Sequence, residues 1–162
     1  MRLTTSRLIL KSITHRDALA LYGVLNDPLV AQYNDYGDSL SHQDIKDLIQ
    51  WDLEQGYSGL GCRMTITNTQ GQLLGTVGLY DFDADTHSVK IGFELASIYW
   101  QRGYMIEAIE CVLENITKLL HLTADTSVLA HLDEQNVRSV NLLLKLGFTK
   151  QSCNLYGKLL TV

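Results

Sequence analysis

The chain has 162 residues, of which 46% are hydrophobic and 19% charged, with a formal net charge of −5. This length predicts one domain over residues 1–162 with a single core. The acidic balance argues against nucleic acid as a partner, although backbone amides can still hold one anion. No apolar run approaches the roughly 18 residues of a membrane helix. The N-terminus also lacks a signal-peptide pattern, so we expect a cytoplasmic protein without membrane contact.

The cysteines and histidines favour neither a metal site nor a redox pair. Cys62, Cys111 and Cys153 are far apart and form no C-x-x-C motif, which is typical of reduced cysteines in the cytoplasm. The five histidines have no recognisable ligand spacing. We therefore expect no metal cofactor.

The first third of the chain alternates a short apolar run with helical patterns. Leu8–Leu10 predicts a strand, and apolar spacing predicts a helix over about His15–Asn26 that ends before Pro28. A polar loop is predicted over residues 34–39. Ser41 is then a plausible cap for a helix over His42–Gln55.

The rest of the chain predicts an antiparallel meander followed by alternating helices and strands. Short turns separate three strands with alternating apolar residues, while later segments return to helical spacing. Gly147 can supply a left-handed cap at the end of the last helix. Such an order predicts a mixed sheet with helices on it. The predicted elements are strands over Cys62–Thr67, Leu73–Phe82 and His87–Leu95, a helix over Tyr104–Leu120, a strand over Ser127–Ala130, a helix over Val137–Leu146, and strand segments from Phe148 and over Leu155–Val162.

The most informative segment joins the strand ending near Leu95 to the helix starting near Tyr104. It contains Gly103, and a loop with glycine at a helix start leaves backbone N–H groups unpaired at the positive end of the helix dipole. Such groups can hold a pyrophosphate without basic side chains. Taken alone, Gly103 is better explained by a tight strand-to-helix turn, because one glycine is a weak signal.

A second segment, N-V-R-S-V-N-L-L-L-K-L-G-F over residues 136–148, changes that balance. Together with T-S-R-L-I-L over residues 5–10 and I-G-F-E-L over residues 91–95, it resembles the GNAT superfamily of acetyl-CoA-dependent N-acetyltransferases, in particular the RimJ/RimL-like branch. The resemblance extends over almost the whole chain in the right order. Each piece is weak, but the combination is specific.

The resemblance implies an α/β (mixed α+β) fold of the acyl-CoA N-acyltransferase type, with a mostly antiparallel sheet, a central splayed parallel strand pair and flanking helices. Acetyl-CoA would enter between the strands through Glu94 and Val128. Backbone amides would hold its pyrophosphate, Leu95 would pair with the pantetheine amides, Asn136 would bind the pantetheine arm and Ser139 would point at the sulfur. Helix capping by Asn136 and Ser139 is the simpler alternative. The expected pyrophosphate-binding residues are Gln101, Arg102, Gly103, Tyr104 and Met105.

Three positions depart from the family pattern. Gln101 replaces a usual glycine, and Met105 replaces a small residue, so Met105 either crowds the phosphates or points into the core. Leu143 stands where many relatives have the tyrosine that protonates the leaving thiolate. Ser139 is the nearest substitute.

The expected chemistry needs a base and an oxyanion contact. Glu94 faces away from the apolar side of its strand and is our candidate base, through a water, with a merely solvated carboxylate as the alternative. The backbone amide near Leu95 is the candidate oxyanion contact.

The resemblance implies acetyl transfer to a primary amine by direct attack in a ternary complex, most simply to a protein or peptide N-terminal α-amino group. A small amine (amino acid, polyamine or aminoglycoside) and a non-catalytic acyl-CoA-binding regulatory domain remain alternatives. Residues 30–58 would form the acceptor wall, with clustered aromatic residues. Either a monomer or a homodimer is compatible with the sequence. The aromatic residues are Tyr33, Tyr36, Trp51 and Tyr57.

Overall fold

A computed structural model describes residues 1–34, 36–37 and 39–162, and over these residues an eight-stranded sheet has the order β1-β2-β3-β4-β5-β6-β8-β7. Neighbouring strands are antiparallel except for the parallel pair β5–β6, so the mixed sheet predicted from the sequence is confirmed. The strands are β1 (Arg2–Thr4), β2 (Leu8–Ser12), β3 (Cys62–Asn68), β4 (Leu73–Asp83), β5 (Ser88–Leu95), β6 (Thr126–His131), β7 (Thr149–Ser152) and β8 (Leu155–Leu160).

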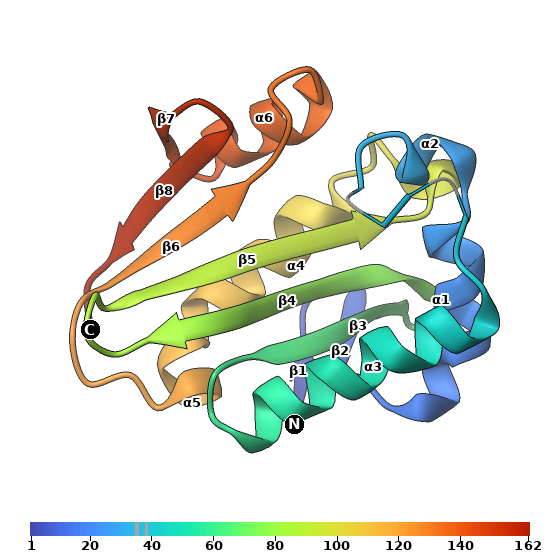
Figure 1. Ribbon diagram of the computed structural model, residues 1–162, viewed down its shortest axis with the longest axis horizontal. Coiled ribbons are helices and arrows are strands. Elements are labelled where there is room, and N and C mark those ends of the chain that lie inside the picture. The colour runs from blue at the N-terminus through green and yellow to red at the C-terminus, as the bar shows by residue number, and fades with distance from the viewer. Residues whose placement is uncertain (35, 38) are drawn as a thin grey trace.

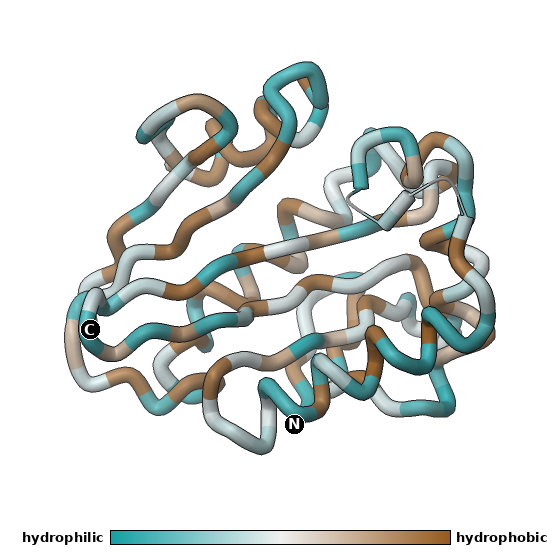
Figure 2. Tube along the Cα trace, in the orientation of Figure 1, coloured by the Kyte–Doolittle hydropathy of each residue, from teal (hydrophilic) through white to brown (hydrophobic). Residues whose placement is uncertain are grey.

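Helices cover both faces of this sheet, with α1 and α3 on one face and α4 on the other (Figure 1). The main core lies between the strands and α4, and a second cluster joins α1 to α3. Apolar and polar residues alternate along α3, as a helix on a sheet surface requires (Figure 2). The helices are α1 (Ala18–Leu25), α2 (Pro28–Ala31), α3 (His42–Tyr57), α4 (Tyr104–Glu114), α5 (Ile116–Leu120) and α6 (Val137–Lys145), with 3₁₀ turns at His15–Asp17 and Ser97–Tyr99.

The parallel strands β5 and β6 pair over only part of their length. Ser88, Val89 and Lys90 are in register with residues 127–129, and no pairing between the two strands follows in the described chain. Beyond that point β5 and the arm formed by β6, β8 and β7 diverge (Figure 1). The splayed pair that the resemblance implied is therefore present.

Local signals in the sequence account for most element ends. Ser41 accepts a hydrogen bond from the Asp44 amide and caps α3, and Asp27 caps α2, which begins at Pro28. Gly147 has a φ of +84° and follows α6, as predicted.

Several expectations differ from the structure or lie outside it. The edge strand β1 and the short helix α2 are missed, the helix predicted over His15–Asn26 begins with a 3₁₀ turn, and the helix predicted over residues 104–120 divides at Asn115. There the Asn115 side chain donates to the Cys111 carbonyl at 2.8 Å and competes with the backbone ladder. Two residues of the predicted loop over 34–39, numbers 35 and 38, lie outside the described residues.

In the described chain, no helix is both long and apolar enough to span a bilayer.

Candidate functional site

A cavity of about 1540 Å³ opens where β5 and β6 part. The end of β5, the start of α4, the end of β6 and residues along α6 line it, together with the segment after α2 and part of α3. Among the predicted catalytic and cofactor-binding residues, Arg102 alone does not line this cavity in the described chain. The predicted residues brought together here are Glu94, Leu95, Gln101, Gly103, Tyr104, Met105, Asn136 and Ser139.

The loop before α4 presents a run of free backbone donors. Trp100 donates its amide to Ser97 and Glu107 donates to Gly103, but the N–H groups of residues 101–106 have no acceptor among the described residues. Gln101 and Gly103 both adopt left-handed conformations, with φ of +60° and +79°. Gln101 thus takes the conformation that glycine would supply, at a cost of about 1 kcal/mol. The loop is an anion-binding arrangement of amides at a helix N-terminus.

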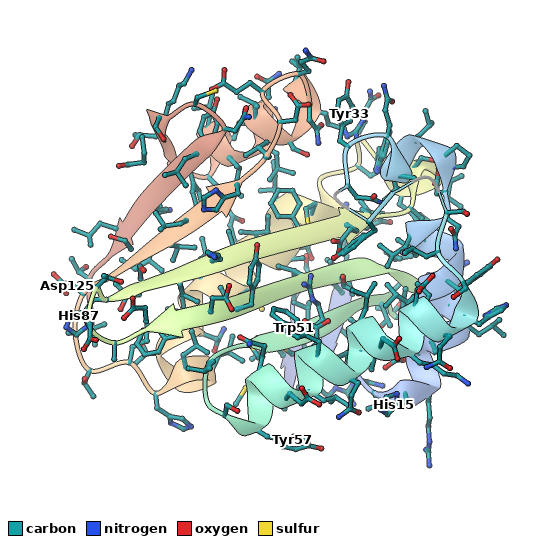
Figure 3. All side chains as sticks on the ribbon, in the orientation of Figure 1. His15, Tyr33, Trp51, Tyr57, His87 and Asp125 are labelled. Atoms are coloured by element: carbon teal, nitrogen blue, oxygen red, sulfur yellow. The ribbon has the colours of Figure 1, made fainter. Side chains whose placement is uncertain are left out.

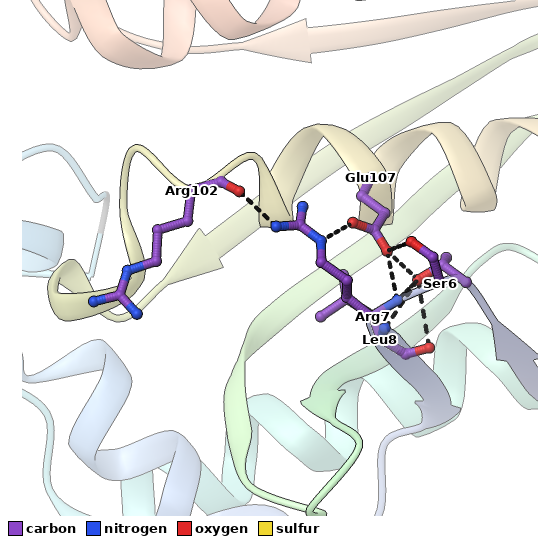
Figure 4. A network of polar contacts seen from close by, with 6 residues as sticks. Ser6, Arg7, Leu8, Arg102 and Glu107 are labelled. Carbon is purple, nitrogen blue, oxygen red and sulfur yellow. Dashed lines mark hydrogen bonds and ion pairs between the residues drawn. The ribbon is translucent and has the colours of Figure 1, made fainter.

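A polar network from the N-terminus supports this loop (Figure 4). Arg7 donates from its side chain to the Arg102 carbonyl at 2.8 Å and to the Glu107 carboxylate at 2.7 Å. The hydroxyl of Thr5 also donates to Glu107, and the Arg7 guanidinium lies 4.5 Å from the centre of the Tyr104 ring. Arg102 therefore takes part through its backbone carbonyl. Sequence reasoning used residues 5–10 only as a strand signal and missed this role.

Trp100 occupies the open edge of β5. Its indole Nε1 donates to the Leu95 carbonyl at 2.7 Å. The guanidinium of Arg138, from α6, stacks 3.2 Å from the centre of the Trp100 ring. These contacts link the loop after β5 to α6 across the mouth of the cavity, and neither side chain was predicted to act there.

The N-terminal end of α6 carries a helix cap and the two side chains that were predicted to contact acetyl-CoA. Asn136 accepts a hydrogen bond from the Ser139 amide at 3.3 Å, so it caps the helix as the simpler alternative proposed. Both residues also line the cavity, and their ligand roles stay predictions. Leu143 is fully buried in the main core, so no side-chain proton donor lies at that position.

Two positions were possible for the Met105 side chain, namely beside the phosphates or in the core, and the structure decides between them. It is only 6% exposed and packs in the main core with the apolar stripe of α4. Its side chain therefore points mainly into the protein, and its backbone amide stays among the free donors.

Glu94 belongs to a buried group of charges on the α3 face of the sheet. Its Oε2 accepts from the Thr76 hydroxyl at 2.8 Å and lies 3.5 Å from Arg63. Arg63 also contacts Asp52 of α3 at 3.3 Å. Burial acts to lower the pKa of Arg63, but the Glu94 and Asp52 carboxylates outweigh it and hold that pKa above its usual value.

Desolvation dominates the other ionisable groups around this cluster. Burial raises the pKa of Asp52, although Arg63 opposes the shift. Burial and the Glu94 charge raise the pKa of Tyr36, so its phenol stays protonated at neutral pH. Asp52 and Arg63 could not be predicted as site residues, because only the fold brings them to Glu94.

Aromatic side chains form much of the wall opposite α6. Tyr33, Tyr36 and Trp51 line the cavity, and the ring of Tyr80 packs edge-on against Trp51 with 5.8 Å between the ring centroids. Their role toward an acceptor stays a prediction. Tyr57 is 84% exposed at the far end of α3 and does not join them (Figure 3). Within the described ranges, no cluster of three or more His, Cys, Asp or Glu residues could hold a metal ion.

Residues 7–149 match the family described as the acetyltransferase (GNAT) domain. The match spans most of the chain, so the chain belongs to the GNAT acetyltransferases, and the predicted family is confirmed. It is an acetyl-CoA-dependent N-acetyltransferase. The uncharacterized N-acetyltransferase YoaA of Bacillus subtilis (strain 168) is 29% identical over 151 residues, covering 92% of this chain and 83% of YoaA.

Solved structures show how widely this fold is shared. The ribosomal L7/L12 alpha-N-protein acetyltransferase RimL, in complex with coenzyme A, aligns with a TM-score of 0.85 at 15% identity, covering 99% of this chain and 98% of RimL. A spermidine N-acetyltransferase from Vibrio cholerae, in complex with CoA and spermine, aligns with a TM-score of 0.77 at 17% identity, covering 98% of this chain and 96% of that one. At these identities the likeness is one of fold, and it agrees with the RimJ/RimL-like architecture predicted.

Proposed function

We propose that the enzyme moves acetyl from acetyl-CoA to the free α-amino group of a protein or peptide, by direct attack in a ternary complex. One observation carries the proposal. Gln101 and residues 103–106, whose backbone amides are unpaired among the described residues, line the same cavity as Glu94. A site for a pyrophosphate and a group that can accept a proton are thus joined by one continuous space.

The cofactor half of the site would use mainly backbone groups. Amides of Gln101 to Met105 would hold the pyrophosphate, which needs no positive surface. The β5 edge at Leu95 would pair with the pantetheine amides, because the edge of β5 that faces β6 has no partner strand beyond residue 90 in the described chain, while its other edge stays paired with β4. Asn136 would add a side-chain contact to the pantetheine arm.

The chemistry would proceed in one addition and one elimination. Glu94, through a water, takes a proton from the acceptor ammonium, and the amine nitrogen then attacks the thioester carbonyl carbon. The Leu95 amide stabilises the oxyanion. The carbon–sulfur bond then breaks, and the attacking nitrogen releases its second proton to water. Ser139 is the candidate donor of a proton to the CoA thiolate, and its hydroxyl is restored by a proton from water.

Two features bear on the acceptor. RimL, an alpha-N-protein acetyltransferase, has the same fold, and this likeness supports an α-amino group as the first candidate. A polyamine is the second candidate, because the Asp52 and Glu94 carboxylates and nearby aromatic rings suit a cation. The spermidine N-acetyltransferase with this fold supports that candidate.

Two measurements test the proposal. Calorimetric titration should detect acetyl-CoA binding, and thiol release should then appear with peptides that carry a free α-amine. Mass spectrometry should locate the acetyl group on the N-terminus. Turnover with spermidine or spermine but not with peptides would replace the first acceptor by the second. Absence of acetyl-CoA binding would refute both.

A further inference from the structure

Arg63 lies across a row of glycines in the centre of the sheet. On the α3 face, Arg63 of β3 is in register with Gly78 of β4, which in turn is in register with Gly92 of β5. A Cβ atom added at Gly78 would meet the Arg63 Nε at 2.6 Å and Cζ at 2.7 Å, whereas one at Gly92 would lie 3.9 Å from its nearest guanidinium nitrogen. The missing side chain at Gly78 therefore makes room for the arginine to cross β4.

The crossing brings the guanidinium to β5. There Arg63 Nη1 donates to the Gly92 carbonyl at 3.4 Å and lies 3.5 Å from Glu94 Oε2, while its Nε contacts Asp52. The Arg63 side chain is only 8% exposed. A glycine inside a central strand weakens that strand, so the space at Gly78 has a cost that the arginine contacts must offset.

These contacts orient the Glu94 carboxylate. Both of its described partners, Arg63 and Thr76, bind Oε2, and Oε1 has no hydrogen bond within the described chain. Because no buried side-chain oxygen there lacks a partner, Oε1 must be accessible. Glu94 lines the cavity, and this places Oε1 as the oxygen free to meet a water or an amine.

We propose that Arg63 is a positioning residue for acetyl transfer: reaching Glu94 through the gap at Gly78, it holds Oε2 and keeps Oε1 available to the acceptor. This inference rests on the proposed role of Glu94. Arg63 also separates two carboxylates that would otherwise repel each other in a buried place. Its function is therefore both geometric and electrostatic.

The charges around Glu94 give the proposal a signature in pH. The titratable groups near the guanidinium are Tyr36 from the loop before α3, Asp52 from α3, Tyr80 from β4 and Glu94 itself. Arg63 opposes the burial that raises the pKa of Asp52, so its removal raises that pKa further. Loss of the positive charge beside the proposed base should also move the acidic limb of the kcat/KM profile to higher pH, because a nearby cation favours the ionised form of a carboxylate, and a purely structural defect would not produce this shift.

Gly78→Ala tests the geometry without removing any charge. The added methyl displaces the flexible arginine side chain, and we expect kcat to fall about tenfold with an unchanged KM for acetyl-CoA, since small misplacements reduce rates strongly. Gly157→Ala in β8 is the matched control. There the methyl meets only the Gln151 side chain, at 3.1 Å, away from the cavity. Equal kcat values for the two variants would overturn the proposal.

Arg63→Gln and the double variant Arg63→Gln/Asp52→Asn test the charge. The single variant should lose ten- to a hundredfold in kcat and shift the acidic limb upward. Removing the Asp52 carboxylate as well should return the acidic limb of the kcat/KM profile toward its position in the wild-type enzyme, while kcat stays low. An unshifted limb in Arg63→Gln, with the fold verified by urea denaturation, contradicts the electrostatic role.

The two proposals can fail separately. If the wild-type enzyme turns over no amine, the proposed function fails. In that case, a carbon-13 NMR titration of the Asp52 carboxyl resonance can still measure the effect of Arg63 on the ionisation of Asp52. Its midpoint should move to higher pH in Arg63→Gln, and an unchanged midpoint would refute the charge coupling whatever the activity.

Discussion

The indole of Trp100 donates a 2.7 Å hydrogen bond to the carbonyl oxygen of Leu95, at the open edge of β5. This is the carbonyl that, in the proposed function, receives an amide of the pantetheine arm. The Arg138 guanidinium stacks on the same indole from α6. Binding of acetyl-CoA in the proposed position therefore exchanges one hydrogen bond of Leu95 for another.

Trp100→Phe should tighten acetyl-CoA binding. Phenylalanine keeps an aromatic ring for Arg138 but cannot donate to Leu95, so the cofactor no longer competes with an indole. A neutral hydrogen bond contributes about 0.5–1.5 kcal/mol, which corresponds to a roughly three- to tenfold lower Kd. Calorimetric titration measures this directly. Weaker binding, at an unchanged stability to urea, would instead show that the indole supports the cofactor-bound loop.

Gly103→Ala should separate the strain of a left-handed residue from its effect on the cofactor. Gly103 has a φ of +79°, and an added Cβ would lie 3.3 Å from Arg7 Nη2. We expect a loss of about 1–2 kcal/mol in stability and at least a tenfold weaker affinity for acetyl-CoA, because the free amides reorient.

Gly71→Ala is the control for that prediction. Gly71 has nearly the same φ, +82°, and open space around it in the turn between β3 and β4. It should lose similar stability and keep its affinity for acetyl-CoA. Equal affinities for the two variants would contradict a role of the Gly103 loop in binding.

Local patterns were enough to predict the elements that build the cofactor side. Alternation along β3 and β5 and the glycine before α4 are signals that each lie within a few residues. The preference of serine for helix N-caps likewise predicted the cap at Ser41 of α3. These features depend on backbone propensity and on the burial of one face. They can therefore be predicted without knowing which strands pair.

The supporting contacts could not be predicted in the same way. Arg7 meets Glu107 across 100 residues of sequence, and the arginine at position 63 reaches Glu94 only because the β3–β4 register places it opposite Gly78. Register is a property of the assembled sheet, since a shift of one residue would turn Arg63 to the other face. Neither Arg63 nor Gly78 indicates a functional role until that strand pairing is known.

Asn136→Ser should distinguish helix capping from cofactor contact. Serine caps a helix about as well as asparagine, so the stability should change by less than about 0.5 kcal/mol. It lacks the side-chain amide that would reach the pantetheine arm, and we expect several-fold weaker acetyl-CoA binding or lower kcat/KM. Binding and urea denaturation are measured on the same samples. Wild-type binding in Asn136→Ser would leave Asn136 with a capping role alone.

Glu107→Gln should remove a pH-dependent support of the cofactor loop. Burial acts to raise the pKa of Glu107, but hydrogen bonds from Thr5 and Arg7 outweigh it and hold that pKa below its usual value. A lowered pKa in the folded state adds stability that is present above the unfolded pKa of about 4.5 and is lost as the pH falls through the folded pKa.

At pH 7, Glu107→Gln should therefore lower the free energy of unfolding by roughly 1 kcal/mol, a modest value because Arg7 is 45% exposed and solvent screens the pair. The difference from wild type should shrink below about pH 4.5, when the wild-type carboxylate takes up its proton. Urea denaturation between pH 7 and pH 3 measures both values. Glu110→Gln, at an exposed position on the same helix, should match wild type throughout, and a Glu107→Gln deficit that is equally large at pH 3 and pH 7 would assign the support to packing rather than to charge.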